Sequence, residues 1–445
     1  MRTKGEGQKP PKKDEPPERV AESTLDRLVD LARNNPQMVF TSLAHRIDLH
    51  LLEISFKQVR NSKAAGVDKV TAKEYAKSLD QNLYNLYQRL RRGQYVAQPV
   101  KRIWIDKEGG KKRPIGITVL EDKIVQKAVY SILEAIYDVD FHDFSHGFRK
   151  GHSPHLAHRE LRAQCRAQRA NWIVNADIKG LFDHIEHELL KEVIKLRVND
   201  GGIIRLIGKW LNAGVLEGES FTKSELGTPQ GGVISPMLAN IFLHHVLDDW
   251  YIREVEPRLK GKSFLIRFAD DFIIGCELKT DAYKVMEVLP KRFGRFGLTL
   301  NEEKSKLIPF MRPGSKSRKG GGTFNFLGFT IYWGRSREGY WVIKKKTARK
   351  RVGRFIRTQR QWCRKNLHKP IRVQHEKLCQ KLRGHYQYFG VRGNFKSLQV
   401  VYENAKKAWY YGLNRRTRKG KMNEGTFRLF LKKYPLCEPR IVHSI

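Results

Sequence analysis

The sequence predicts an α+β fold followed by a basic, mostly helical C-terminal region. Strand-like apolar segments alternate with helix-like segments, but without the regular β-α-β spacing of a doubly wound parallel sheet. The chain has 445 residues, of which 40% are hydrophobic. That is enough for about two to four domains with apolar cores. After about residue 335, Lys and Arg interleave with aromatic residues in a helical pattern.

Helices are predicted from the periodic spacing of apolar residues. Residues 1–20 are rich in Pro, Lys and Glu, and we expect them to be disordered. From Leu25 onward, leucines and valines follow a helical pattern. Helical segments are expected within residues 21–60, 121–136 and 203–213 and, after a Gly/Pro loop, within 228–250.

Strands are predicted from apolar runs that are bounded by turn residues. Residues 103–117 predict a hairpin that turns at Gly109-Gly110, and residues 172–185 predict a strand, a turn and a helix. Residues 263–276, SFLIRFADDFIIGC, predict a second hairpin, and FNFLGFTIYW (324–333) closes this part of the chain.

The charge of the chain indicates a polyanionic partner. Lys and Arg number 86 against 46 Asp and Glu, a formal net charge of +40. This excess favours a nucleic acid held through its phosphates, with an anionic membrane surface as the competing partner. No run of about 18 apolar residues is present, and the N-terminus has no apolar signal-peptide segment. The five cysteines are scattered without a CxxC pair, which fits a reducing compartment.

Asp270 and Asp271 are unusual because two adjacent carboxylates interrupt an apolar hairpin. The simpler interpretation is a solvated turn, since Asp favours turns. The alternative is a metal site that also involves Asp177, which ends another apolar strand. Three carboxylates from two neighbouring strands can hold two Mg²⁺ ions about 4 Å apart for phosphoryl transfer. Metal would then neutralise charges that burial otherwise penalises.

Five further residues fit a nucleotidyl transferase, and each has a structural alternative. Lys107 and Arg113 bracket the Gly-Gly turn. The hairpin is then either a basic arm that folds over a triphosphate or an ordinary exposed hairpin. Gln230 lies in TPQGG before a helix. Backbone and amide donors there can contact a nucleotide, or the segment is an ordinary loop that leads into the helix. Phe182 is a candidate contact to a sugar, or a core aromatic. Lys304 is a candidate contact to pyrophosphate, or a surface lysine.

Two other features, a pair of histidines and a run of basic residues, each allow a structural and a functional interpretation. His184 and His187 lie three residues apart but lack a third ligand at the spacing of a metal site, so we interpret them as structural. Residues 344–360 contain nine basic residues and no acid. A charge run is often only a solvated helix face, but the aromatic residues that follow favour a nucleic-acid-binding helical domain.

Taken together, the motifs resemble the successive blocks of bacterial group II intron-encoded reverse transcriptases, also called maturases. These blocks are, in order, AAGVDKVT, WIDKEGGKKRPIGITVLEDKIVQ, SHGFRKGHS, ADIKGLFDHI, GTPQGGVISPMLANIFL, RFADDF, NEEKSK and FLGFT. The tail, LRGHYQYFGVRGN through PLCEPRIVH, is similar to the maturase region, or domain X. The resemblance covers residues 37–445 and depends on the combination of motifs.

The resemblance implies a right-hand polymerase whose fingers and palm contain an antiparallel sheet and are followed by an α-helical thumb/maturase domain. The implied domains are a basic Pro/Lys-rich tail with a leading helix (1–36), fingers and palm (37–334) and thumb or domain X (335–445). The implied activity is RNA-directed DNA synthesis, in which dNTPs are added to a primer 3′-OH with two Mg²⁺ ions. The implied partners are an RNA template, the chain's own intron RNA and a DNA primer or target. A bacterial, cytoplasmic location without a membrane partner is expected.

The resemblance also assigns roles to individual residues. The catalytic, metal-binding acids are Asp177, Asp270 and Asp271, with Ile178 as a further metal-site residue. The dNTP-binding residues are Lys107, Arg113, Phe182, Gln230 and Lys304, and Phe182 is the aromatic that excludes a ribose 2′-OH. The primer/template-binding residues are Phe268, Ala269, Arg383 and Tyr386.

The chain departs from the family pattern in places. The family usually has Tyr at the position of Phe268, so one hydroxyl near the primer end is lost while the metal ligands are kept. HGFRKGHSPH differs from the commoner form of its block. No Cys/His endonuclease cluster follows the thumb before Ile445, so we expect the protein not to cleave the target strand itself.

Two alternative functions stay open. A non-catalytic RNA-binding splicing factor would keep the fold but lose the acids or the fingertip cations, all of which this chain retains. A domesticated reverse transcriptase, in antiphage defence or linked to CRISPR, would keep the chemistry. The sequence separates this second alternative poorly, although the full maturase-like tail favours an intron.

Overall fold

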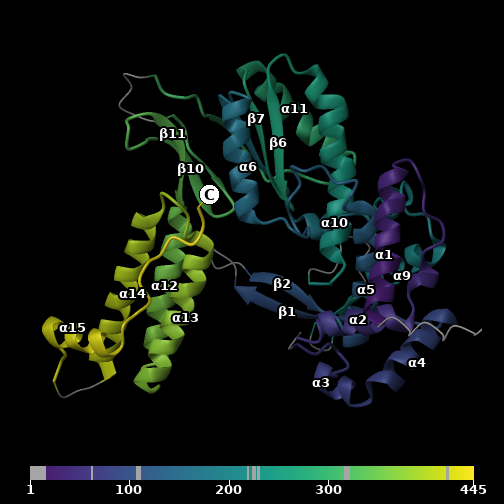
Figure 1. The fold of residues 1–445 in the computed structure, drawn as a ribbon, viewed down its shortest axis with the longest axis horizontal. Helices are drawn as coiled ribbons and strands as arrows, with labels where there is room; N and C mark the ends of the chain where they lie inside the picture. The colour runs from purple at the N-terminus through teal and green to yellow at the C-terminus, as the bar shows by residue number, and fades with distance from the viewer. Residues whose placement is uncertain are drawn as a thin grey trace, which may run out of the picture. The chain divides into compact units, whose positions relative to one another are not determined.

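The computed structural model describes residues 17–61, 64–106, 112–217, 220–222, 227, 231–314, 321–416 and 420–444, without the side chains of residues 17–23, Asp106 and Arg113. The predicted disordered tail up to residue 16, Lys107, the Gly109-Gly110 turn and Gln230 lie outside the described residues. The chain divides into two compact units (Figure 1). Unit 1 contains residues up to Gly151, Ile178–Pro257 and Val288–Asn301, and unit 2 contains His152–Asp177, Arg258–Glu287 and Glu302–Ile445.

Unit 1 is built around helix α5 (Leu120–Tyr137), which is buried along most of its length. Helices α1 (Pro17–Asn34) and α2 (Leu49–Val59) pack against it. The other helices of unit 1 are α3 (Ala72–Tyr75), α4 (Leu79–Arg91), α7 (Leu181–His184), α8 (His187–Lys195), α9 (Gly201–Leu211) and α10 (Ser235–Leu243), with short 3₁₀ turns at Ala44–Arg46, Ala76–Ser78 and Glu256–Arg258. Helix α10 continues as two π-helical stretches, His244–Asp249 and Tyr251–Val255.

The sheet of unit 1 has the strand order β2-β1-β4-β5. The predicted hairpin is formed by β1 (Val100–Asp106) and β2 (Lys112–Ile117), which pair antiparallel. On its other side β1 pairs parallel with β4 (Val215–Glu217), which pairs antiparallel with β5 (Ser220–Thr222). The parallel pair was not predicted, because its strands are separated by several helices and no local turn signal joins them.

Unit 2 contains an antiparallel sheet with the strand order β6-β7-β3-β8. Its strands are β3 (Trp172–Asp177), β6 (Ser263–Phe268), β7 (Asp271–Cys276) and β8 (Lys306–Pro309). Helix α6 (Pro154–Ala167) packs on β6 (Figure 1). Strands β6 and β7 are buried on both faces, which explains their continuous apolar runs. Helix α11 (Lys279–Gly294) follows β7.

A second antiparallel sheet in unit 2 extends the same core. It consists of β9 (Phe324–Phe326), β10 (Phe329–Arg335) and β11 (Trp341–Thr347). Aromatic side chains of this sheet, Phe326 and Phe329 among them, pack in one apolar cluster with residues of α6, β6 and β7. Because β11 completes this sheet first, the all-helical part begins at Arg349 and not near residue 335.

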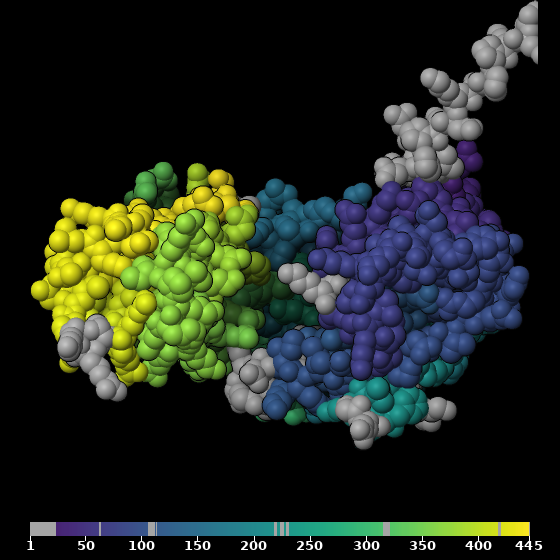
Figure 2. Space-filling view, turned by 90° about the horizontal axis from the view of Figure 1, so that it is seen from below, coloured from purple at the N-terminus to yellow at the C-terminus, as the bar shows by residue number. Residues whose placement is uncertain are grey.

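Four helices complete unit 2: α12 (Arg349–Lys365), α13 (Ile371–Phe389), α14 (Phe395–Arg416) and α15 (Glu424–Lys433). They form a closely packed group, in yellow-green to yellow in Figure 2. Their core is centred on Trp409, which is buried and donates its indole N–H to Gln374 Oε1 at 3.1 Å. The region therefore has an apolar core of its own beneath its basic surface.

The predicted α+β class, with a helical C-terminal region, is confirmed by these sheets and helices. The predicted hairpin at residues 263–276 and the strand, turn and helix at 172–185 are also confirmed. Within the described residues, no helix is both long enough and apolar enough to cross a bilayer.

A buried hydrogen-bonded chain fixes α5 in unit 1. The Trp210 indole N–H donates to the Tyr95 hydroxyl at 2.8 Å, and that hydroxyl donates to Asp122 Oδ1 at 2.5 Å. The Gln98 backbone N–H donates to the other carboxylate oxygen of Asp122. Burial raises the pKa of Asp122 to about 6, because these hydrogen bonds do not fully replace water.

We predict that Asp122→Asn changes how stability depends on pH. Between about pH 4 and 6 the folded protein keeps a proton on Asp122 that the unfolded chain has lost, so stability falls as pH rises through this window. Asn carries no such charge. As the pH rises from 4.5 to 7, the free energy of unfolding of the variant should therefore increase relative to that of the wild type, by on the order of 2 kcal/mol. Thermal midpoints at the two pH values measure the effect. Asp26→Asn, at an exposed acid of α1, is the control, and an equal pH response in both variants would refute the assignment.

Candidate active site

Asp177 and Asp271 are brought together by strand pairing. Asp177 ends β3, Asp271 begins β7, and the two residues lie directly opposite each other in the antiparallel register. Directly opposed residues have their side chains on the same face of a sheet, with Cβ atoms about 5 Å apart. Pairing therefore brings together two carboxylates that are nearly a hundred residues apart in the sequence.

Asp270 is the third carboxylate and lies in the two-residue turn between β6 and β7. Ala269, the first residue of this turn, has φ 57°, in a region that glycine normally occupies in such hairpins. A non-glycine residue in this conformation costs about 1–2 kcal/mol. The fully buried Arg267 helps to hold the turn by donating from Nη1 to the Ala269 carbonyl at 3.2 Å. The predicted hairpin tip is confirmed, with one aspartate in the turn and the other at the start of the strand.

The three carboxylates influence one another electrostatically. Burial, together with the charges of Asp270 and Asp177, raises the pKa of Asp271 to about 7. The backbone N–H of Leu327 and the charge of Lys304 act in the opposite direction but do not cancel this effect. All three acids remain partly exposed. The cluster thus combines three acidic side chains that are partly open to solvent.

Lys304 supplies a cation that contacts the cluster. Its ammonium nitrogen lies 2.5 Å from Asp177 Oδ2, and its side chain is 56% exposed. The next residue, Ser305, accepts a hydrogen bond from the Asp177 backbone N–H at 3.5 Å. Lys304 therefore lies at the acid cluster and is placed there by the turn that leads into β8, while its predicted contact with a nucleotide stays a prediction.

The turn between β9 and β10 is a contact of the cluster that sequence reasoning missed. Leu327 and Gly328 both have positive φ, 45° and 81°, as in a type I′ hairpin turn. Leu327 hydrogen-bonds through its backbone N–H to the Asp271 carboxylate. Its carbonyl accepts from the Tyr388 hydroxyl of α13 at 2.8 Å. The Leu-Gly pair between apolar strands signals a turn, but nothing local to it indicates Asp271 as its partner.

The chemistry of the donor atoms fits a hard divalent cation. Mg²⁺ prefers carboxylate oxygens and keeps several of its ligands as water or phosphate. Asp177, Asp270 and Asp271 offer such oxygens on one partly exposed edge, and the Lys304 ammonium acts as a stand-in cation on Asp177. Ile178, the other predicted metal-site residue, has a buried aliphatic side chain, so only its carbonyl could take part.

The predicted nucleotide-binding residues other than Lys304 belong to unit 1. Phe182 lies on α7 and is partly buried. Arg113 is in β2, but its side chain is not described, and Lys107 and Gln230 lie outside the described residues. Their roles therefore stay predictions.

The predicted primer and template contacts differ in exposure. Phe268 is partly buried beside the turn, and Ala269 is nearly buried within it. Arg383 is exposed on α13, and its Nη1 atom lies 3.5 Å from Cys437 Sγ. Tyr386, in contrast, is fully buried, and its hydroxyl donates to the Cys437 carbonyl at 3.1 Å. The structure thus places Tyr386 in the core of the helical region, because its side chain faces α14 and not solvent.

Two hollows in unit 2 are lined by cations without acids among the described residues. One, of about 570 Å³, lies on α12 and α14 and is lined by the cations Arg360, Arg364, Arg415 and Lys421 together with Tyr410 and Tyr411. The other, of about 680 Å³, lies between α6 and the β10–β11 hairpin and includes Arg162, Arg337, Lys344, Lys345 and Arg392. No acid lines either hollow among the described residues. Both are suited to phosphate groups, and the first also offers aromatic faces.

Residues 105–331, about half of the chain, match the family described as reverse transcriptase (RNA-dependent DNA polymerase). The matched region includes the acid cluster, Lys304 and the Leu327-Gly328 turn. The chain belongs to this reverse transcriptase family. Reverse transcriptases use divalent metal ions, in agreement with the oxygen-rich donor set.

Curated relatives confirm the resemblance to group II intron reverse transcriptases and maturases. The group II intron-encoded protein LtrA of Lactococcus lactis subsp. cremoris is 36% identical over 243 residues, which cover 54% of this chain and 40% of LtrA. Protein YkfC of Escherichia coli is 32% identical over 313 residues, covering 63% of this chain and 79% of YkfC. Nuclear intron maturase 1 of Arabidopsis thaliana is 29% identical over 121 residues, covering 26% of this chain and 17% of the maturase. The chain thus spans less than half the length of LtrA.

We predict that Gly328→Ala destabilises the protein by about 1–2 kcal/mol, because a Cβ is unfavourable at its φ of 81°. The added methyl meets only ordinary contacts, the nearest at 3.5 Å, so the cost arises from the backbone. Gly353→Ala is the matched control. It lies in α12 with open space around it, and the same change there should stabilise by about 0.5–1 kcal/mol. Thermal midpoints of the two variants should move in opposite directions, and a shift in the same direction would contradict the proposed turn.

Proposed function

We propose that this protein is an RNA-directed DNA polymerase that adds dNTPs to a primer 3′-OH by two-metal-ion nucleotidyl transfer. The observation that carries the proposal is the convergence of Asp177, Asp270 and Asp271 at one edge of the β6-β7-β3-β8 sheet, in a chain of the reverse transcriptase family. The right-hand arrangement of fingers, palm and thumb is part of the proposal. The two sheets of unit 2 and helices α12–α15 would form palm and thumb.

The acids would hold the metal ions, and the chain's other residues would prepare the site. When bound, two Mg²⁺ ions stabilise the charge that develops on the attacking and leaving oxygens of an in-line displacement. The protein holds the carboxylates ready through the β3–β7 register and the Ala269-Asp270 turn. The Leu327 N–H orients Asp271. Lys304, whose ammonium group pairs with Asp177, would contact the phosphates of an incoming nucleotide.

The nucleotide would be held by residues of unit 1. We assign Lys107 and Arg113 to the triphosphate, Gln230 to the nascent base pair, and the Ile178 carbonyl to metal. Phe182 would exclude a ribose 2′-OH through its bulk. These roles follow from the positions of the residues in the family motifs.

Binding of intron RNA and assistance to its splicing form a second, compatible function. The basic and aromatic hollow on α12 and α14 supports RNA binding by the helical region. Relatives named as intron-encoded proteins and intron maturases support the same function. A domesticated role would leave the polymerase chemistry unchanged. The intron-associated role and the domesticated role can be distinguished by whether a folded intron RNA flanks the reading frame.

We predict that Asp270→Asn and Asp271→Asn each reduce primer extension by at least about 1,000-fold, because each removes a carboxylate that would hold the metal ions whose charge stabilisation lowers the barrier. The assay is extension of oligo(dT) on poly(rA) with Mg²⁺. The same variants should bind the primer–template with unchanged affinity, which separates lost chemistry from lost binding.

Glu303→Gln is the matched control for these variants, since Glu303 is an exposed acid next to Lys304. It should retain near-normal synthesis. Normal extension by either aspartate variant would refute the proposed mechanism. Absence of synthesis by the wild type, with RNA binding intact, would instead favour a non-catalytic splicing factor.

We further predict that Phe182→Val raises incorporation of rNTPs relative to dNTPs by about 10-fold or more, the range over which a steric pocket discriminates. Single-nucleotide extension with dNTP and rNTP gives the ratio of the two kcat/KM values. Tyr84→Ala, at an exposed aromatic residue of α4, should leave this ratio unchanged. Unaltered discrimination in Phe182→Val would exclude Phe182 as the residue that selects the sugar.

A further inference from the structure

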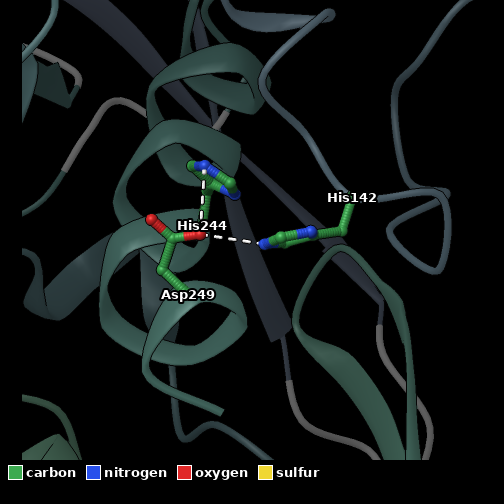
Figure 3. A group of neighbouring side chains, drawn as sticks. All are labelled: His142, His244 and Asp249. Carbon is green, nitrogen blue, oxygen red and sulfur yellow. Dashed lines mark hydrogen bonds and ion pairs between the residues drawn. The ribbon is translucent and has the colours of Figure 1, made fainter. Parts of the chain in front are cut away.

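A second cluster of metal-binding side chains lies in unit 1. His142, from the loop after α5, and His244, from the helix that continues α10, both direct ring nitrogens at the carboxylate of Asp249 (Figure 3). His142 Nε2 lies 2.9 Å from Asp249 Oδ1, and His244 Nε2 lies 3.6 Å from the same oxygen. One ligand atom from each residue falls within 4.8 Å of the other two.

The π-helical backbone is what makes His244 and Asp249 neighbours. In an α-helix, residues five apart lie about 140° apart around the axis, at about 100° per residue. The stretch His244–Asp249 is π-helical, with hydrogen bonds from i to i+5, so five residues make up little more than one turn. Such π-helical stretches are rare and occur frequently at functional sites.

The donor spacing suits a small divalent ion. With metal–ligand bonds of about 2.0–2.1 Å, two ligands of a tetrahedral Zn²⁺ lie about 3.3 Å apart. The two measured distances to Asp249 Oδ1, 2.9 and 3.6 Å, lie on either side of that value. Side-chain exposures of 31% for His142, 13% for His244 and 22% for Asp249 leave the cluster accessible to an ion.

The surroundings orient the ligands. The second oxygen of Asp249 lies 3.5 Å from Arg253 Nη2, which leaves Oδ1 facing the two imidazoles. The fully buried carboxylate of Asp248 lies 3.9 Å from His244 Nδ1, on the side of the ring away from Nε2. At this distance Asp248 places negative charge beside the ring but does not accept a hydrogen bond from it. Burial acts to raise the pKa of Asp249, but the hydrogen bond with His142 and the charges of His244 and Arg253 outweigh it and lower this pKa.

We propose that His142, His244 and Asp249 form a binding site for a transition-metal ion, with Zn²⁺ as the expected occupant and water in the fourth position. Two imidazoles and one carboxylate suit Zn²⁺ and other late first-row ions, whereas Mg²⁺ prefers oxygen ligands. The site thus differs in chemistry from the acid cluster of unit 2. A bound ion would connect the loop after α5 to the π-helical segment. This proposed metal site does not depend on the proposed polymerase function.

The test is metal binding by the untagged, full-length protein. After treatment with EDTA and dialysis, the protein should take up one Zn²⁺ per chain in competition with a chromophoric chelator, and excess Mg²⁺ should not displace it. His142→Gln and Asp249→Asn should each weaken binding by about 100-fold or more. Loss of a group that only orients a ligand already costs 10–100-fold. Substitution with Co²⁺ should give visible d–d bands without thiolate charge-transfer absorption.

His245→Gln is the matched control. This neighbouring histidine has its ring 5.9 Å from Phe296 and is not one of the three ligands. It should bind Zn²⁺ like the wild type, and circular dichroism should show that all the variants are folded. Absence of stoichiometric Zn²⁺ in the wild type at micromolar free ion would overturn the proposal. So would retention of the ion by both His142→Gln and Asp249→Asn.

Discussion

The acid cluster of unit 2 depends on one physical constraint, which is the cost of burying a carboxylate beside two others. The register of β3 and β7 places Asp177 opposite Asp271, and the β6–β7 turn adds Asp270. Burial of Asp271, reinforced by the charges of Asp270 and Asp177, disfavours its ionisation, which is why the pKa of Asp271 rises. The fold supports the arrangement with a buried arginine beneath the turn, a backbone N–H from Leu327 and the ammonium of Lys304. These contacts hold the acids in place.

The same contacts connect the acids to the C-terminal helices. The Leu327-Gly328 turn donates to Asp271 and accepts from Tyr388 of α13. The Gly328 carbonyl accepts from the Ala348 N–H, at the start of α12. A displacement of these helices would therefore be transmitted to the carboxylates through one short turn. In a polymerase, this arrangement would couple nucleic-acid binding by the helical region to the geometry of the metal ligands.

The chain combines two kinds of donor set, which lie in different units. Oxygen ligands alone, as in the acid cluster, suit a cation that exchanges water and phosphate. Nitrogen ligands with one carboxylate, as at His142, His244 and Asp249, suit an ion that stays bound and orders the backbone. The π-helical segment shows how a small change in helix geometry brings ligand side chains together that an α-helix would hold apart.

By itself the sequence determined the family, the class of fold and the β6–β7 hairpin, and it named the candidate acids, because apolar periodicity, turn residues and motif order are local signals. Only the tertiary structure decided what depends on distant pairing. It placed β4 parallel to β1, directed Leu327 to Asp271, buried Tyr386 in the helical core and brought His142 to His244. The physical reason is the same in each case. Such contacts join segments whose separation in the chain leaves no periodic or turn signal, and they form only when the apolar faces of whole elements pack together.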